Sequence, residues 1–289
     1  MAATFDRMSG GRLIVNVVGG GDPVELAGDG IFVDHDARYE LMDEFLCIWR
    51  QLVGGEEFSF DGKYLKIAKG NVPFPCVQEP HPPLFMGGSS EAAKRIAVEH
   101  IDTLLTWAEP LADLAAKLTS VRAAETKGRR IRFGIRLHII VRETEKDAWA
   151  AADDLIRYLD AQTIAGSQAV LGRTQSEGQK RMNALHNGGK AHDLEVSPNL
   201  WAGVALVTGG AGTALGRQSE SRGRAVTGIR RSWDRDFHSV GLPSSRGGIS
   251  RRGNAFSPPT NRRGSRAVGT CSPPSSACHS RRMVSARGS

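Results

Sequence analysis

Ile-Arg-Phe-Gly-Ile-Arg-Leu-His-Ile-Ile, residues 131–140, alternates apolar with charged or small side chains and ends in an apolar pair. This period of two predicts a single β-strand. Helical patterns flank it, and a strand between helices is usually buried on both faces. Arg132, Arg136 and His138 would then share a buried face, where a cation needs an anionic partner. That anion is either a carboxylate of the protein or the phosphate or sulfonate of a ligand.

Short apolar runs and segments of helical period alternate on both sides of this stretch. The runs predict strands at residues 12–18, 84–86, 103–107 and 131–141. The helical periods predict helices at residues 2–8, 34–52, 91–100, 110–126, 144–163 and 168–185. Asp61-Gly62, between the runs 57–60 and 63–67, predicts a hairpin with a two-residue turn. The βαβαβα order predicts a parallel α/β sheet, either open or closed into a barrel.

Charge is divided unevenly along the 289 residues of the chain. The 38 Lys and Arg against 31 Asp and Glu give a net charge of +7, which taken alone suggests a nucleic acid partner. Residues 217–289 hold 15 Arg and only three acidic residues, which leaves 23 basic and 28 acidic side chains in residues 1–216. The body is therefore an ordinary acidic globular protein, for which nucleic acid binding is not expected.

After residue 216 the composition becomes that of a low-complexity segment. Of the last 73 residues, 44 are Arg, Ser, Gly or Pro. Such a segment buries too little apolar surface to offset its loss of conformational entropy, which predicts disorder. We therefore expect a folded domain at 1–215 and a tail at 216–289. Within the domain we expect a lid or insertion at about 164–215, in which residues 186–216 are irregular and Gly-rich. An Arg-rich arm that binds RNA is the alternative use of the tail.

The four cysteines show neither metal-ligand spacing nor a disulfide framework. Cys47 falls in an apolar helical pattern, as a core thiol does, so we expect a reducing, cytoplasmic environment and no metal. The first residues lack the basic and apolar regions of a signal peptide. No apolar run approaches the roughly 18 residues of a membrane span, so no membrane partner is expected.

Two glycine-containing loops follow predicted strands. Gly87-Gly88-Ser89-Ser90 leads into a helix N-terminus, where free backbone N–H groups, the helix dipole and two hydroxyl groups suit a phosphate. The alternative is that Ser89 or Ser90 is a plain helix N-cap. Gly19-Gly20-Gly21-Asp22 lacks the spacing of a phosphate-loop motif. It is either a simple turn or a loop where a ligand approaches the backbone.

Three further features suggest ligand contacts. Trp107 ends a predicted strand, and strand C-termini face the active site of a barrel, so its ring either stacks on a ring cofactor or packs in the core. Arg136 and His138 would offer a fixed cation and a titratable donor to an anionic substrate. Asn16 would be a buried amide that binds a ligand or a neighbouring backbone group.

Four phrases of the sequence resemble one family of flavin enzymes. They are Ala-Thr-Phe-Asp-Arg-Met-Ser-Gly-Gly-Arg (3–12), Glu-Leu-Ala-Gly-Asp-Gly (25–30), Ile-Arg-Phe-Gly-Ile-Arg-Leu-His (131–138) and Ser-Pro-Asn-Leu-Trp-Ala-Gly (197–203). Together with residues 83–90 and 106–110, they are similar to the two-component alkanesulfonate monooxygenases of the luciferase-like group. The resemblance covers residues 1–215 almost continuously.

The resemblance implies a (β/α)8 TIM barrel that uses reduced FMN as a co-substrate. It implies that a separate NAD(P)H-dependent FMN reductase delivers this FMN, and that the protein is a homo-oligomer. It further implies that O2 and an alkanesulfonate react to give an aldehyde and sulfite, a reaction of sulfur acquisition.

The resemblance also assigns roles to individual residues. Arg136 and His138 match the family's active-site pair, which would bind the sulfonate and stabilise negative charge that develops on the flavin. Trp107 matches the family's aromatic residue at the flavin site. The remaining matches are cofactor-binding positions in the phosphate loop and at the pocket mouth, namely Gly88, Ser89, Ser90, Asn16 and Asp22.

The sequence departs from the family in several places. Three βα units and an active-site cysteine precede the family position that matches Ala2, and neither Cys47 nor Cys76 replaces that cysteine. Thr208 stands where the family has a lid arginine. After Leu215 the family continues with a helix, an eighth strand and a Ser-Gly-Tyr-Pro-His segment that carries a catalytic tyrosine, whereas the low-complexity tail begins here.

These departures predict a barrel that is incomplete at both ends. Codons allowed for residues 216–223 and 235–247, read one nucleotide later, can spell Val-Gly-Asn-Pro-Lys-Val-Val and Ala-Thr-Phe-Ile-Leu-Ser-Gly-Tyr-Pro-His-Leu-Glu, so a reading-frame shift explains the tail. We expect an impaired or inactive enzyme with exposed sheet edges. The alternatives are a non-catalytic fragment, an RNA-binding protein that uses the tail, or a luciferase-like monooxygenase for an alkane, a sulfone or a chelator.

Overall fold

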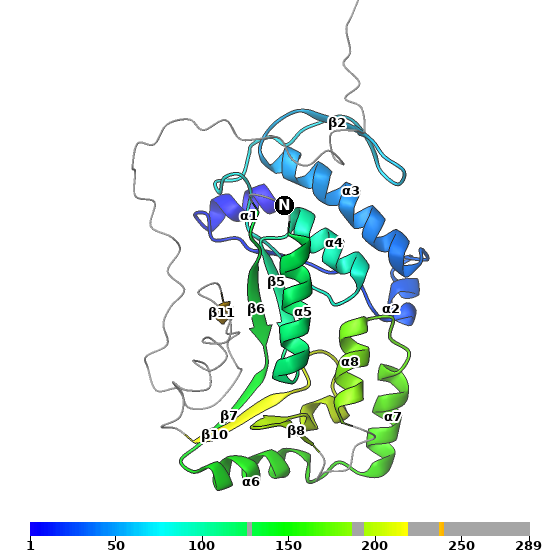
Figure 1. The fold of residues 1–289 in the computed structure, drawn as a ribbon. Helices are drawn as coiled ribbons and strands as arrows, with labels where there is room; N and C mark the ends of the chain where they lie inside the picture. The colour runs from blue at the N-terminus through cyan, green and yellow to red at the C-terminus, as the bar shows by residue number, and fades with distance from the viewer. Residues whose placement is uncertain (126–128, 187–193, 219–236, 240–289) are drawn as a thin grey trace, which may run out of the picture. The chain divides into compact units, whose positions relative to one another are not determined.

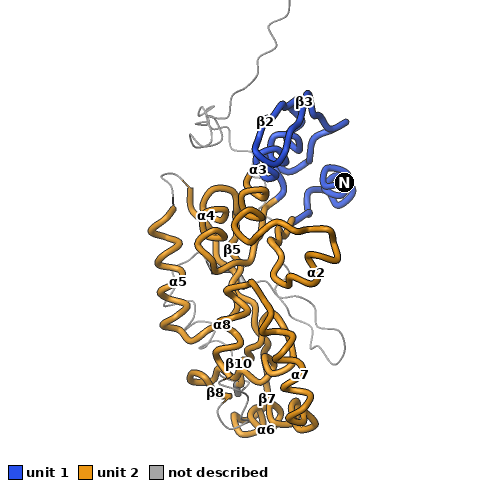
Figure 2. Tube along the Cα trace, turned by 90° about the vertical axis from the view of Figure 1, so that its right-hand side faces the viewer, with its two compact units in different colours: residues 1–14, 44–82, 241–289 blue, residues 15–43, 83–240 orange. Residues whose placement is uncertain are grey.

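The computed structural model describes residues 1–125, 129–186, 194–218 and 237–239 (Figure 1). The Cα trace separates into two compact units, coloured separately in Figure 2. Unit 1 contains residues 1–14 and 44–82, and unit 2 contains the described residues of 15–43 and 83–240. The predicted disorder and reading-frame shift of the tail fall almost wholly outside the described residues.

Unit 1 contains one whole helix, part of another and a β-hairpin. Its elements are α1 (Ala2–Met8), the C-terminal part of α3 (His35–Val53), β2 (Phe58–Asp61) and β3 (Lys66–Gly70). Its apolar side chains form two small clusters, one around Ala3, Val53 and Cys76 and one around Cys47, Ile48 and Phe60. The buried Asp6 carboxylate accepts hydrogen bonds from the backbone of residues 77 and 78, which ties α1 to the chain after the hairpin.

The hairpin turn is longer than predicted. β2 ends at Asp61 but β3 begins only at Lys66, and the N–H of Gly62 donates to the carbonyl of Leu65 at 2.9 Å. The buried Glu44 carboxylate causes this, because it accepts the N–H groups of residues 63, 64 and 65 at 2.7, 2.9 and 2.9 Å. A two-residue turn predicted from Asp61-Gly62 could not present three successive N–H groups to one side chain.

Unit 2 is organised around a five-stranded sheet. Its strands, in spatial order, are β1 (Val15–Val17), β4 (Leu84–Gly87), β5 (Thr103–Trp107), β6 (Arg132–Arg136) and β11 (Phe237–Ser239). All neighbouring pairs are parallel, as the alternating pattern predicts. Helices α4 (Glu91–His100) and α5 (Leu111–Ala124) pack against each other along one face of this sheet (Figure 1). The buried apolar side chains of its strands include Leu84, Met86, Leu104, Phe133 and Ile135.

A second sheet in unit 2 has the strand order β7-β10-β9-β8. Its strands are β7 (His138–Arg142), β8 (Glu195–Ser197), β9 (Leu200–Trp201) and β10 (Ala214–Gln218), with the 3-10 helix η2 (Gly203–Leu206) between β9 and β10. The described part of residues 186–216, predicted to be irregular, is therefore partly regular. The predicted boundary at 215 falls inside β10, which pairs in parallel with β7.

Three helices lie between β7 and β8 along the chain. They are α6 (Glu145–Ile156), α7 (Ala161–Leu171) and α8 (Glu177–Leu185). The single helix predicted at 144–163 is wrong, because the Asp160 carboxylate caps α7 by accepting the Thr163 N–H at 2.6 Å. The helix predicted at 168–185 is likewise interrupted between α7 and α8.

Candidate active site

The C-terminal edge of the parallel sheet gathers most of the residues proposed from the sequence. Because the strands are parallel, the loops that follow β1, β4, β5 and β6 all leave from the same edge. Ligands of α/β folds bind at this edge. The loops that leave it are residues 18–22, 88–90, 108–110 and 137.

The predicted single strand at residues 131–140 is two strands, and this corrects the first expectation. The Ala108 N–H donates to the Arg136 carbonyl at 3.2 Å, so Arg136 still belongs to the five-stranded sheet. The N–H of His138 donates to the Thr213 carbonyl at 2.9 Å, so His138 already belongs to the second sheet. The chain changes sheet at position 137, although its alternating pattern continues.

The predicted buried cations are exposed, which is a second correction. Arg132 and Arg136 occupy the two exposed ends of β6, whereas residues 133–135 between them are buried. The His138 side chain is also exposed, and its Nε2 lies 3.0 Å from the carbonyl oxygen of Ala211. Because a carbonyl only accepts, Nε2 carries the proton and Nδ1 remains for another partner.

Trp107 and Arg136 are partners in the ladder between β5 and β6. Trp107 is half-buried, and one edge of its ring is covered by other parts of unit 2. A Cβ on Gly178 would lie 3.3 Å from Trp107 Cζ3, and one on Gly210 would lie 4.0 Å from Cζ2. The structure therefore brings the predicted aromatic residue and the predicted cation together at the sheet edge.

The Gly87–Ser90 loop connects β4 to the N-terminus of α4. Ser90 is the N-cap, because its hydroxyl oxygen accepts the Ala93 N–H at 3.1 Å, so the plainer of the two predicted roles holds for Ser90. Ser89 makes no hydrogen bond within the part of the chain that the structure describes. The first N–H groups of α4 lack intrahelical acceptors by position. The loop thus offers a half-buried hydroxyl and helix N–H groups to an anion.

Tyr39 joins this loop to the one after β1, and only its place in a helix could be predicted from the sequence. Its side chain is buried and shares a hydrogen bond with the Ser90 side chain. Burial raises the pKa of the Tyr39 phenol, against the opposing effects of Ser90 and Arg38. A Cβ on Gly19 would lie 3.2 Å from the phenol oxygen, and one on Gly88 would lie 3.7 Å from it.

Arg38 fixes the glycine loop after β1 through hydrogen bonds within the protein. Its buried guanidinium donates to the carbonyl of Gly19 at 3.0 Å and to Gln175 Oε1 at 2.7 Å. The carbonyl of Gly21 accepts the Gln175 N–H at 2.7 Å. The protein itself therefore occupies backbone acceptors of this loop.

Two predicted residues near this loop have other surroundings than expected. Asn16 in β1 is exposed, so the expectation of a buried amide is wrong. The strand is only three residues long at the edge of the sheet, which leaves its side chain open to solvent. Asp22 is the N-cap of α2 (Pro23–Gly28) and accepts the N–H groups of Val24 and Glu25 at 2.7 and 3.3 Å.

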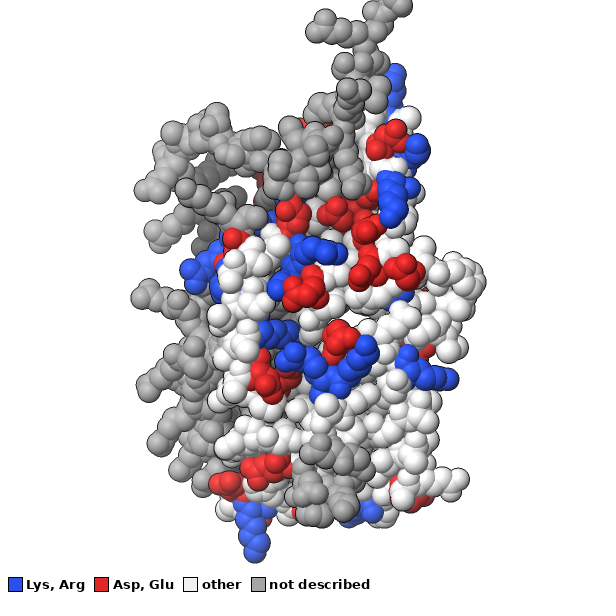
Figure 3. Space-filling model, turned by 45° about the vertical axis from the view of Figure 1, so that its right-hand side comes forward, with Lys and Arg blue, Asp and Glu red and all other residues white. Residues whose placement is uncertain are grey.

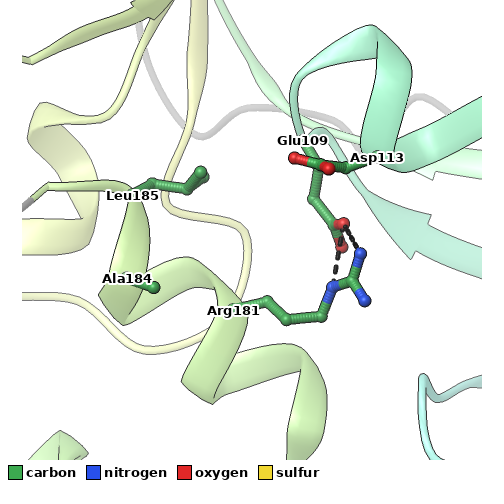
Figure 4. Close-up of a pocket in the computed structure, with 5 residues that line it drawn as sticks. All are labelled: Glu109, Asp113, Arg181, Ala184 and Leu185. Atoms are coloured by element: carbon green, nitrogen blue, oxygen red, sulfur yellow. Dashed lines mark hydrogen bonds and ion pairs between the residues drawn. The ribbon is translucent and has the colours of Figure 1, made fainter.

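A charged cluster at the end of β5 was not predicted, because its members are far apart in sequence. The buried Glu109 carboxylate accepts from Arg181 Nε at 3.0 Å and lies 2.7 Å from Nη2 (Figure 4). Lys117 Nζ lies 3.6 Å from Glu109 and donates to Thr106 Oγ1 at 2.7 Å. Burial lowers the pKa of Lys117, although the charge of Glu109 opposes this. A cavity of about 260 Å³ adjoins the cluster and is lined by Glu109, Asp113, Arg181, Ala184 and Leu185.

Residues 1–215 match the model of one protein family, described as luciferase-like monooxygenase. The chain belongs to this family. Membership accounts for the parallel sheet with its loops gathered at one edge. It also confirms the predicted fold class, an α/β fold of the luciferase-like TIM-barrel type.

Solved structures share the fold of this luciferase-like chain at low sequence identity. A riboflavin lyase, RcaE, is 19% identical with a TM-score of 0.64, and the match covers 83% of this chain and 61% of the lyase. A long-chain alkane monooxygenase, LadA, is 22% identical with a TM-score of 0.51, and the match covers 59% of this chain and 46% of the monooxygenase. A coenzyme F420-dependent tetrahydromethanopterin reductase from Methanopyrus kandleri is 17% identical with a TM-score of 0.53. This match covers 84% of this chain and 72% of the reductase. The chain thus spans about half to three-fifths of the length of the first two.

Two further observations bear on the setting of the luciferase-like chain. None of the helices in the described residues is both long and apolar enough to cross a membrane. Among the described residues, Cys47 and Cys76 are buried thiols outside any disulfide. Neither residue lies in unit 2, which contains the candidate active site.

Proposed function

We propose that this luciferase-like monooxygenase uses reduced FMN and O2 to convert an alkanesulfonate into an aldehyde and hydrogen sulfite. In the net reaction one oxygen atom of O2 enters the aldehyde, the other leaves as water, and FMN is released oxidised. A separate NAD(P)H-dependent reductase would supply the reduced FMN. The observation that carries the proposal is the loop from Gly87 to Ser90, which offers a hydroxyl group and helix N–H groups to an anion at the same sheet edge as Trp107 and Arg136.

The donors of this loop fit the phosphate of FMN. The Ser89 hydroxyl is without a partner among the described residues, and the Tyr39 phenol beside Ser90 stays protonated because its pKa is raised. The helix dipole of α4 adds favourable charge. The nearest carboxylate along the chain, Glu91, is exposed and paired with Lys94 at 2.6 Å, so it opposes a phosphate little. When bound, reduced FMN would supply the electrons that activate O2.

Arg136 and His138 would act on the sulfonate end of the substrate. The exposed Arg136 guanidinium offers paired donors that match two sulfonate oxygens. His138 holds its Nε2 proton on the Ala211 carbonyl, which orients the ring and leaves Nδ1 to accept or, when protonated, to donate. Trp107 would exclude water from one side of the site, because its ring is half-buried at the end of β5.

Other substrates and roles are distinguished by the same side chains. A fixed cation at Arg136 would favour a negatively charged sulfonate or chelator over a neutral alkane or sulfone. An RNA-binding role would use the tail, and residues 219–236 and 240–289 of the tail lie outside the described part of the chain. On the face shown in Figure 3, basic and acidic side chains of the described residues are interspersed, which does not favour a nucleic acid surface.

The proposal also covers the compartment, the turnover rate and the oligomeric state of the enzyme. A reducing cytoplasm suits the two buried thiols. Thr208 is exposed where the resemblance places a lid arginine, so we expect slow turnover. A homo-oligomer is expected from the resemblance alone.

A sulfite-release assay tests the proposed substrate class. With reduced FMN, O2 and octanesulfonate we expect sulfite, and we expect no product from an alkane, dimethyl sulfone or EDTA supplied instead. Arg136→Ala should lower the rate about 100-fold, because two charge-assisted hydrogen bonds are lost. Arg132→Ala is the matched control, since Arg132 is exposed at the opposite end of β6. Equal rates for the two variants, or product from the alkane alone, would contradict the proposed substrate.

A further inference from the structure

His138 is held by the short segment 211–213, which directly precedes β10. The N–H group of His138 donates to the Thr213 carbonyl at 2.9 Å, and its ring Nε2 lies 3.0 Å from the Ala211 carbonyl oxygen. The backbone and the ring of one histidine are thus bonded to the same three residues. The place and orientation of the His138 ring therefore depend on where this segment lies.

The side chain of Thr213 connects this segment to the five-stranded sheet. Its hydroxyl group donates to the Ala108 carbonyl at 2.9 Å. Ala108 directly follows Trp107, and its own N–H group donates to the Arg136 carbonyl at 3.2 Å. Thr213 is fully buried and Ala108 is 4% exposed, so water does not compete for this bond. One residue is therefore hydrogen-bonded both to the loop after β5 and to His138.

The chain between Arg136 and His138 does not by itself fix these two side chains relative to each other. Arg136 ends β6 in the five-stranded sheet, whereas His138 begins β7 in the second sheet. Leu137 lies between the two strands, and rotation about its two soft backbone dihedrals would turn one sheet against the other. A contact across this break must hold the two sheets in place, and the Thr213 hydroxyl group makes such a contact.

We propose that Thr213 is a positioning residue of the candidate active site. Its carbonyl group holds His138 and its hydroxyl group holds the loop that follows Trp107. It thereby sets where the titratable ring stands relative to the fixed cation of Arg136. An anionic group that binds to both side chains needs this geometry to be constant. The effect on turnover rests on the proposed function, whereas the effect on the His138 ring does not.

Variants at position 213 separate positioning from packing. Thr213→Val keeps nearly the shape of threonine but leaves the buried Ala108 carbonyl without this donor, whereas Thr213→Ser keeps the donor. Thr103→Val is the matched control, because Thr103 is 2% exposed and lies at the opposite end of β5.

Nitrogen NMR of the full chain, with ¹⁵N in its eight histidines, measures the tautomer of the His138 ring. His138→Gln identifies the signals. In the parent chain the proton should lie mainly on Nε2, because the Ala211 carbonyl only accepts. In Thr213→Val the fraction with the proton on Nδ1 should rise about fivefold, the effect of losing one neutral hydrogen bond. Thr213→Ser and Thr103→Val should keep the parental ratio.

Sulfite release adds a kinetic measurement. With reduced FMN, O2 and octanesulfonate, Thr213→Val should lower kcat about tenfold, because the His138 ring is misplaced during turnover. KM should change less than about twofold, because Arg136 still binds the sulfonate. Thr213→Ser should restore kcat to within about twofold of the parent value.

The outcomes separate a positioning residue from a merely structural one. An unchanged tautomer ratio in Thr213→Val would overturn the proposal. Thr213→Ala replaces this variant if the valine protein does not fold, and failure of both to fold would mean that the hydroxyl group only stabilises unit 2. Absence of sulfite from the parent and from every variant would count against the proposed function, whereas the tautomer ratio would still decide on Thr213.

Discussion

Replacing Gly88 by alanine is expected to destabilise unit 2 by about 2 kcal/mol and to weaken FMN binding about tenfold or more. A Cβ at this position would lie 2.5 Å from the Cβ of Ala93, which is fully buried in the first turn of α4. Neither atom can yield unless the loop moves away from the helix. That movement would misalign the Ser89 hydroxyl and the helix N–H groups, so stability and affinity should fall together.

Gly87→Ala is the matched control for this prediction. Its Cβ would meet only the carbonyl oxygen of Leu105, at the ordinary contact distance of 3.9 Å. Urea denaturation and a fluorescence titration with FMN should therefore give values close to those of the parent chain. If Gly88→Ala also matched the parent in both measurements, the loop would not depend on its close contact with α4.

Asp6→Asn is expected to destabilise unit 1 by about 3 kcal/mol. The buried carboxylate accepts from the N–H groups of Val77 and Gln78 at 2.7 and 2.9 Å, and from Gln78 Nε2 at 2.7 Å. An asparagine has one acceptor oxygen in place of two, and its amide group would meet a buried N–H donor. Asp61→Asn is the control in the same unit, because the Asp61 side chain is 64% exposed and pairs with an equally exposed Lys66.

The same carboxylate predicts a dependence of stability on pH. Burial acts to raise the pKa of Asp6, but the hydrogen bonds from Gln78 and Val77 outweigh it and hold the pKa below its usual value. Its stabilisation is therefore complete above the pKa of an unfolded aspartate, about 3.9, and is lost as the pH falls through the lower folded pKa. Urea denaturation of the parent should show this loss, and Asp6→Asn should lack it. A parent and variant with parallel pH profiles would contradict the assignment.

The parallel sheet could be predicted from local pattern, because its strands are continuous apolar runs between amphipathic helices. The strand at 103–107 and the helix at 91–100 have the bounds that were predicted. The stretch at 131–140 shows the limit of such a pattern. Its alternation is uninterrupted, yet the chain changes sheet at position 137, because β10, which follows 76 residues later, pairs with β7. No local signal records that partner.

The parts of the candidate site that depend only on a residue's position after a strand could be predicted from the sequence. Trp107 and the Gly87–Ser90 loop follow strands, and parallel strands bring them to one edge. The expected burial of Arg136 and His138 was wrong, since both occupy strand ends rather than a covered strand centre. Tyr39 and the pair of Glu109 with Arg181 were missed because each acts across a long sequence separation.

The ratio of FMN to riboflavin affinity measures whether the loop after β4 binds the phosphate of FMN. Riboflavin lacks the phosphate but keeps the ring system, so the ratio isolates the loop. The parent chain should prefer FMN about 100-fold, and Ser89→Ala combined with Tyr39→Phe should lower this preference about tenfold or more. Ser120→Ala, on exposed α5 surface, should leave the preference unchanged. Equal affinity of the parent chain for FMN and riboflavin would show that this loop does not bind the phosphate.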